Sequence, residues 1–303
     1  MGKIGPIMMI AVSATLWGII AIFVRKLALL GFTSMEIVTL RVVTAVLLLG
    51  IIGITKYPGQ MKIRFVDSKY FIGTGIFSIV LFNWCYFTAI NQMSLSFAVI
   101  LLYTAPTFVV VLSYLFLKEN MDSRKIISVI GTLIGCALIV GVSFNDSPTI
   151  NLVGILTGLG AGFGYALYTI FGKFALVKYR PFTVTFYTFL VAAVTLLLFT
   201  DLIEKRSMLV SGEVIIYGVS LGLFPTVIAY LLYTKGLEKM ESSKASIIAT
   251  VEPVAATLLS VFLYKENFGM LQFVGTVIIL LSVILINLPK QPIELIKTGL
   301  QHK

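Results

Sequence analysis

Long apolar stretches separated by short polar segments divide the 303 residues of the chain. A helix needs about 20 mainly apolar residues to cross the roughly 30 Å of hydrocarbon in a bilayer. Ten stretches have this length, near residues 6–28, 34–55, 70–90, 95–117, 125–143, 152–174, 182–200, 214–234, 245–264 and 269–288. The pattern predicts an all-α integral membrane protein with ten transmembrane helices and no soluble domain of useful size.

Composition agrees with lipid as the solvent. The chain is 58% apolar and 12% charged, whereas soluble domains carry about 25% charged residues. The first stretch is too long for the apolar core of a signal peptide and shows no small-residue cleavage site, so we interpret it as a retained helix. Cys85 and Cys136 lie inside apolar stretches and fit neither a disulfide framework nor a metal site. No cofactor or metal is predicted.

The distribution of charge predicts the topology. With Arg41 left inside the second stretch, the loops on one side of a ten-helix arrangement receive 17 Lys and Arg residues and the loops on the other side receive 5. Cytoplasmic loops carry the excess of Lys and Arg. Both termini, including the tail 291–303, are therefore expected in the cytoplasm of a cell whose membrane the chain crosses many times. The net charge of +10 is explained in this way and does not indicate a nucleic-acid partner.

The two halves of the chain resemble each other. Residues 93–98 (MSLSFA) match 240–245 (MESSKA), and Pro106 matches Pro253, both at an offset of 147. At the same offset, 118–120 (KEN) falls on 265–267 (KEN). Each repeat, 1–147 and 148–290, contains five helices, and an odd number requires the second repeat to be inverted. Inverted repeats are typical of secondary transporters that work by alternating access, with sites near the membrane midplane.

These residues also carry a resemblance to a known family. In the first half they are Trp17-Gly18, Arg41, Ala98, Tyr103-Thr104-Ala105-Pro106 and Lys118-Glu119, and in the second half Ala245, Glu252-Pro253-Val254-Ala255, Lys265-Glu266 and Gly275. In their order and spacing they resemble the EamA group of the drug/metabolite transporter superfamily over nearly the whole chain. The resemblance implies an inner-membrane carrier with ten helices and a central cavity, which often exports amino acids or other small metabolites.

Glu252 is the strongest single candidate for a functional group. It lies inside the ninth stretch, where a carboxyl group costs about 2.5–3.5 kcal/mol and usually faces a bundle interior or a wet cavity. Pro253 cannot donate a backbone hydrogen bond, which frees carbonyls beside the carboxylate. Such a group could hold a cation, an ammonium group or a coupling proton. The alternative is that Glu252 bonds a neighbouring helix and only stabilises the fold.

Aromatic and amide side chains could line the cavity around it. Spacing of three residues puts Asn83 and Tyr86 on one helix face, and likewise Tyr230 and Tyr233. Buried tyrosine hydroxyls and amides need partners, which favours an inward orientation. The predicted substrate-binding set is Trp17, Asn83, Tyr86, Tyr103, Tyr165, Tyr230, Tyr233 and Glu252. For any single ring except Trp17, simple packing is the favoured explanation.

Other residues have two interpretations each. Pro106 and Pro253 are either hinges or fixed bends. Arg41 either binds an anion or pairs with carbonyls to hold two helices together; the second is favoured because the resembled family often has arginine here whatever its substrate. Glu119 and Glu266 each precede a helix that they are expected to cap. The ladder Gly154, Gly158, Gly162 permits close helix approach, within the monomer or across a homodimer.

The leading hypothesis is a secondary active transporter of small organic metabolites such as amino acids, with protons as a candidate coupling ion. Efflux is favoured by the resemblance alone. An importer or exchanger of a small metabolite is an alternative within transport. A channel or a purely structural bundle is a further alternative to a transporter. A membrane enzyme acting on a lipid-linked substrate would need reactive groups that converge at one membrane boundary, and no such cluster is found in the sequence.

Overall fold

The computed structural model describes residues 4–141, 151–202, 204–265 and 267–288. In these ranges ten helical stretches are long and apolar enough to cross a membrane, which confirms the ten-helix prediction. The first five spans are α1 (Ile4–Gly18) with α2 (Ile20–Leu29), α3 (Ser34–Lys56), α4 (Ser68–Ile72) with η3 (Gly73–Val80) and α5 (Leu81–Gln92), α6 (Leu95–Leu102) with α7 (Ala105–Leu117), and α8 (Ser123–Val140).

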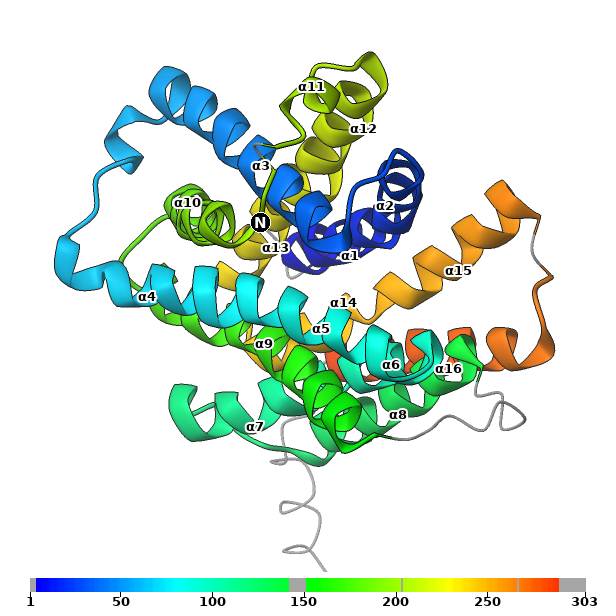
Figure 1. Ribbon diagram of the computed structural model, residues 1–303. Coiled ribbons are helices and arrows are strands. Elements are labelled where there is room, and N and C mark those ends of the chain that lie inside the picture. Colours follow the sequence, from blue (N-terminus) through cyan, green and yellow to red (C-terminus); the bar gives the residue numbers. More distant parts are fainter. Residues whose placement is uncertain (1–3, 142–150, 203, 266, 289–303) are drawn as a thin grey trace, which may run out of the picture.

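The second five spans repeat the interruptions of the third and fourth spans, but not that of the first. They are α9 (Leu152–Leu176), α10 (Pro181–Phe199), α12 (Gly212–Gly222) with η4 (Leu223–Ile228) and α13 (Ala229–Glu238), α14 (Ser242–Ala249) with α15 (Val251–Tyr264), and α16 (Met270–Asn287). Three short helices, η1 (Pro58–Gln60), η2 (Phe65–Asp67) and α11 (Arg206–Leu209), lie beside or between spans. Figure 1 shows the spans as one bundle from which α15 leads outward.

Local sequence explains where several helices begin and end. Thr33 and Glu36 form a reciprocal capping box at the start of α3, and Asp122 accepts from the amide of Lys125 at the start of α8. Lys118 and Lys265 end α7 and α15 in the left-handed region, both with φ 56°. The two lysines are equivalent in the repeat, so the two helices end by the same backbone geometry.

The helices pair in a pattern that fits an inverted repeat. The third span packs on the sixth and the eighth packs on the first; likewise the fourth packs on the sixth and the ninth packs on the first. The fifth and tenth spans pair directly through Gly135 and Gly275, where a Cβ added at Gly275 would lie 2.6 Å from the carbonyl oxygen of Gly135. These contacts between the halves have equivalents, which fits two repeats related by an axis in the membrane plane.

Two π-helical segments interrupt equivalent spans. In the third span η3 ends just before Asn83, and in the eighth span η4 ends just before Tyr230. Segments of π-helix are rare and occur frequently at functional sites. Pro225 inside η4 lacks an amide hydrogen and explains part of the interruption there. Their equivalent positions direct attention to the centre of the bundle.

Polar contacts connect the loops that share an end of the bundle. At one end, Lys178 pairs with Asp67 at 2.6 Å and Lys173 donates to the carbonyl of Met240 at 2.6 Å. We call this end, which carries residues 56–69, 118–125, 173–180 and 235–244, the lysine-rich end. At the opposite end Lys205 pairs with Glu36 at 2.7 Å. The loops that the charge pattern assigned to one side therefore do meet on one side.

Candidate functional site

The fourth and ninth spans are both broken near their middle. In the fourth span α6 ends at Leu102 and α7 begins at Ala105; in the ninth span α14 ends at Ala249 and α15 begins at Val251. Pro106 and Pro253 lie in the first turn of the second half-helix, where a missing amide hydrogen breaks no helical bond. The hydroxyls of Thr104 and Thr250 each donate 2.6 Å bonds to a carbonyl three residues earlier.

An aromatic cluster fills the space beside these breaks. Trp17 lies against Tyr230 and Tyr233, with ring centroids 5.2 Å apart in both cases, and against Tyr165 at 6.0 Å. A pocket with room for about one water molecule, roughly 10 Å³, lies among these rings. The indole nitrogen of Trp17 is buried and has no hydrogen-bond partner among the described residues. A buried donor beside a pocket is a position that a polar ligand atom can satisfy.

A second pocket of similar size lies on the other side of Tyr165. Glu252, Tyr103 and Tyr165 line it together with Thr250 and Ser246. Glu252 lies in the first turn of α15, and the exposed amides and dipole of a helix start stabilise negative charge there. The break at Thr250 therefore places a helix N-terminus and a carboxyl group together in the interior of the bundle. Tyr165 connects the aromatic pocket to the acidic one.

The structure brings together six of the eight side chains predicted for the cavity. Trp17, Tyr165, Tyr230 and Tyr233 line the first pocket, and Tyr103, Tyr165 and Glu252 line the second. Asn83 lines neither, because its amide donates a 2.7 Å bond to the carbonyl of Ile79 on its own helix. Tyr86 also lines neither pocket and stacks on Phe82 with centroids 5.9 Å apart.

Sequence reasoning did not select several residues that border the pockets. The largest of them is Tyr168, which lies 5.0 Å from the Tyr230 ring and shares a 2.7 Å hydrogen bond with Thr234. Thr169 makes the same kind of bond, at 2.7 Å, with Tyr233. The spacing of three between Tyr165 and Tyr168 was a signal that could have found Tyr168. The remaining ones, Ser78, Phe82 and Ser246, lie in apolar stretches and give no such signal.

Arg41 differs from its favoured interpretation. Its side chain is 6% exposed in α3, but its Nε and one terminal nitrogen, Nη2, have no hydrogen-bond partner among the described residues. Pairing with carbonyls would have satisfied them. The neighbouring acid Glu36 does not compensate Arg41, because Glu36 caps α3 and pairs with Lys205.

The glycine ladder works within the monomer. A Cβ added at Gly158 would lie 2.5 Å from Leu101, and one added at Gly162 would lie 2.9 Å from the carbonyl oxygen of Leu101. The ladder therefore lets α9 approach α6 closely. These glycines are used inside the chain and give no support to a dimer interface.

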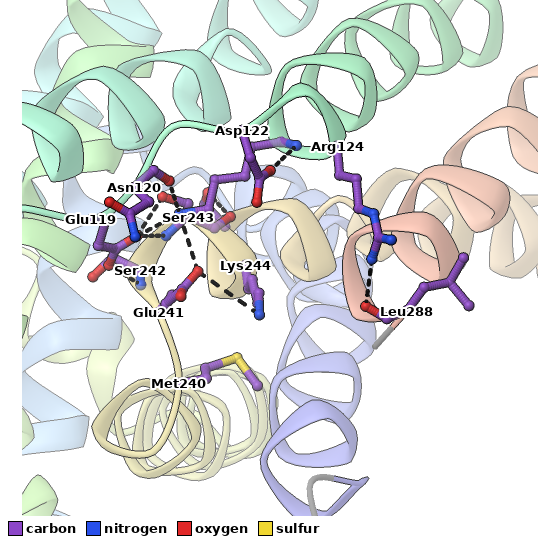
Figure 2. Close-up of polar contacts among 12 residues, drawn as sticks. Glu119, Asn120, Asp122, Arg124, Met240, Glu241, Ser242, Ser243, Lys244 and Leu288 are labelled. Atoms are coloured by element: carbon purple, nitrogen blue, oxygen red, sulfur yellow. Dashed lines mark hydrogen bonds and ion pairs between the residues drawn. The ribbon is translucent and has the colours of Figure 1, made fainter. Parts of the chain in front are cut away.

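The prediction that Glu119 caps the helix that follows it is wrong, because Asp122 does so. Glu119 instead accepts hydrogen bonds from the amides of Ser242, at 2.5 Å, and Ser243, at 3.1 Å, at the start of α14 (Figure 2). The left-handed turn at Lys118 directs the chain away from α7 and toward the other half. Local spacing could not reveal this, because the capped helix lies 123 residues further along. Glu266 lies outside the described residues.

A ten-span bundle with two broken helices, buried rings and a carboxyl group at its centre is the architecture of a membrane carrier. The comparisons with known proteins agree. The chain belongs to the EamA-like transporter family, which matches residues 4–141 and 152–288.

Relatives and a solved structure extend over most of the chain. An uncharacterized transporter of Archaeoglobus fulgidus is 26% identical over 279 residues, which are 91% of this chain and 94% of the relative. The uncharacterized inner membrane transporter YicL of Salmonella typhimurium is 28% identical over 66% of each chain. One crystal structure superposes with a TM-score of 0.80 at 17% identity over 94% of this chain and 97% of that chain, which shows the fold. The protein is a multi-pass membrane transporter.

Proposed function

We propose that the protein is a secondary active transporter that moves small organic metabolites, such as amino acids, across the cell membrane by alternating access. Efflux is the favoured direction, and both termini are taken as cytoplasmic. Residues 1–147 and 148–290 are the two inverted five-helix repeats. The observation that carries this proposal is the pair of pockets on either side of Tyr165, one with the free indole donor of Trp17 and one with the carboxyl group of Glu252.

The pockets define how a substrate would be held. Rings of Trp17, Tyr230 and Tyr233 offer stacking and cation–π surfaces, the latter worth about 0.5–2 kcal/mol. Glu252 offers a site for an ammonium group or a coupling proton, and Tyr103 completes its wall. Pro106 and Pro253 lie in the first turns of the half-helices, which would rotate about the breaks. Asn83 and Tyr86, which both lie in α5, stay in the proposed set. They would face the pockets only after a rearrangement of the helices.

Counter-flow in proteoliposomes tests the proposal. Purified protein is reconstituted with a panel of unlabelled metabolites inside, and uptake of each labelled metabolite is measured. A carrier shows transient accumulation that depends on the internal metabolite. A channel gives only equilibration, and an enzyme acting on a lipid-linked substrate gives no flux.

Substitution of the carboxyl group then tests its role. Glu252→Gln keeps the shape of the side chain and removes its charge. Flux should fall sharply, and the pH dependence of the remaining flux should flatten, while the yield of folded protein stays close to that of the parent. Glu213→Gln, at an exposed position in α12, is the matched control. Normal flux with a normal pH profile in Glu252→Gln would remove this residue from the mechanism. Import and exchange use the same site, so the direction is read from the flux itself.

A further inference from the structure

The two ends of the bundle differ in how their equivalent half-helices pack. At the lysine-rich end α7 packs on α14, whereas at the opposite end α15 has no comparable packing on α6 in the described part of the chain. Val109, Val110 and Ser113 of α7 are buried. Their equivalents at offset 147, Ala256, Thr257 and Ser260, line a groove of about 210 Å³. The fourth and ninth spans are therefore packed together at the lysine-rich end and separated at the opposite end.

A cluster of charged groups connects the pair at the closed end. Glu119, which follows α7, accepts bonds from the amides of Ser242 and Ser243 and from the Ser243 hydroxyl, the last at 2.5 Å (Figure 2). Lys125 of α8 is 2% exposed and lies 3.5 Å from Glu119 and 3.1 Å from Glu241. We call Glu119, Lys125, Glu241, Ser242 and Ser243 the latch. The hydrogen bonds that Ser242 and Ser243 of α14 donate to Glu119 join the second half of the chain to the first.

Two residues of the latch, Glu119 and Glu241, line an open cleft. This cleft has a volume of about 1080 Å³, and Glu119, Glu241 and Lys244 belong to its lining. It shares no lining residue with the two central pockets. The cleft thus lies at the lysine-rich end and is separate from the two central pockets.

α14 connects the latch to the proposed site. Its first residues, Ser242 and Ser243, are held by Glu119, and its last turn supplies Ser246 and Ala249 to the pocket that contains Glu252. The helix has eight residues, so a displacement of its start moves the pocket wall. Breaking the bonds to Glu119 is therefore a step that opening from this end requires.

We propose that Glu119 is a positioning residue of the transport cycle, which holds the start of α14 and keeps the central pockets closed to the lysine-rich end. This inference rests on the proposed function. Loss of the Glu119 bonds shifts the population toward the state that is open at that end, because a conformational equilibrium moves by the difference in interaction between its two states.

A matched control exists at the same end. Asp67 is also buried and also accepts from two side chains, Lys178 at 2.6 Å and Tyr179 at 2.9 Å. It joins the third and sixth spans, which pack together along their length, as do the equivalent eighth and first spans. Because this pair is closed in both repeats, Asp67→Asn removes a comparable interaction without releasing either end.

Cysteine labelling from each face of the membrane tests the proposal. The reporter is Ser246→Cys, a nearly isosteric change at a position 2% exposed, in a chain whose two native cysteines are replaced by alanine. Gly59→Cys, which has open space around it, identifies the face that carries the lysine-rich end. A maleimide that cannot cross the membrane is added to cells or to inside-out vesicles, and the labelling rate is measured in the parent, Glu119→Ala, Glu119→Gln, Ser243→Ala and Asp67→Asn.

Glu119→Ala should raise labelling from the lysine-rich face by about tenfold, the effect of one lost charge-assisted hydrogen bond, and lower it from the other face. Ser243→Ala should give a smaller change in the same direction, and Asp67→Asn none. Unchanged rates in the Glu119 and Ser243 variants, or an equal rise in Asp67→Asn, would overturn the proposal. If Glu119→Ala does not fold, Glu119→Gln and Ser243→Ala decide by the same criteria. The labelling experiment needs no transported metabolite. If the labelling rates shift as expected but no metabolite flux is found, the role of the latch would be supported and the proposed transport function contradicted.

Discussion

The two broken spans, the fourth and the ninth, share sequence and backbone geometry but not surroundings. Both break before a proline, and both end at a left-handed lysine. Yet Val109 and Val110 of α7 are buried against neighbours, while the corresponding part of α15 borders a groove. Two nearly equivalent helices in unequal environments are what a carrier captured at one point of its cycle would show. The comparison teaches that equivalent backbone breaks and helix ends do not by themselves give equivalent packing, because the contacts between the halves differ at the two ends.

The largest expected effect comes from locking the closed end. In a chain whose two native cysteines are replaced by alanine, Glu119→Cys and Ser243→Cys joined by a short bis-thiosulfonate reagent, which forms a disulfide with each thiol and releases sulfinate, should abolish transport, because α14 can no longer leave α7. Reduction of the link should restore it to the level of the unlinked double variant. Flux in proteoliposomes before linking, after linking and after reduction is the measurement. Full flux in the linked protein would show that the contact between α7 and α14 does not keep the lysine-rich end closed.

A second prediction concerns the close approach of α1 to α15, the second half of the broken ninth span. A Cβ added at Gly18 would lie 2.9 Å from the amide nitrogen of Ala256, so Gly18→Ala forces α1 and α15 apart. Overpacking of this kind costs about 1–3 kcal/mol. At an offset of 148, which matches Trp17 with Tyr165 in these spans, the equivalent position on α9 is already an alanine, Ala166, and is fully buried. Thermal unfolding in detergent should show a clear loss for Gly18→Ala and little change for Gly59→Ala, where nothing lies within 4 Å. Equal losses would remove close approach as the explanation.

A smaller effect is expected in the aromatic cluster. Tyr233→Phe removes the 2.7 Å bond to Thr169 and leaves that hydroxyl unpartnered in a buried place. Hydrogen bonds between membrane helices contribute about 0.6 kcal/mol on average and up to about 1.7. We expect a loss in this range for Tyr233→Phe and for Tyr168→Phe, which loses its bond to Thr234. The double change Tyr233→Phe with Thr169→Val should recover part of the loss, since no orphaned hydroxyl remains. A double variant no more stable than the single one would contradict this.

The smallest effect concerns pH at the latch. Burial alone raises the pKa of Glu119, but hydrogen bonds from Ser243 and Ser242 and the charge of Lys125 outweigh it and lower the pKa below its ordinary 4.5. A lowered folded-state pKa contributes stability that is present above the unfolded value and is lost as pH falls through the folded one.

The stability difference between the parent and Glu119→Gln should therefore stay constant from pH 6 to pH 8 and narrow only below about pH 4. The other charged groups that line the same cleft as Glu119 are Lys118, Lys173, Glu238, Lys239, Glu241 and Lys244, and Glu241→Gln is the control for their contribution. Melting temperatures of the purified protein across pH are the measurement. A difference that narrows between pH 6 and pH 8 would assign a pH switch to the latch instead.

Sequence alone determined the spans, the repeat and much of the candidate site. The spans follow from length and hydropathy, because only a helix satisfies its own backbone in lipid. Glu252, Tyr103 and the pairs Trp17 with Tyr165 and Tyr230 with Tyr233 could be chosen because polar and aromatic groups inside apolar stretches need an interior. Repetition at offsets of 147 and 148 then indicated equivalent spans for them.

Only the tertiary structure decided which groups meet. Asn83 satisfied its amide on its own helix, Arg41 left two nitrogens without a partner, and Tyr168 joined the cluster through Thr234, a residue 66 positions away. Glu119 caps a helix of the other repeat rather than its own neighbour. These outcomes depend on pairings between distant segments, which residue spacing cannot encode. The difference between the two ends is of the same kind: it lies in the packing of α7 on α14 compared with that of α15 and α6, and neither half reveals it by itself.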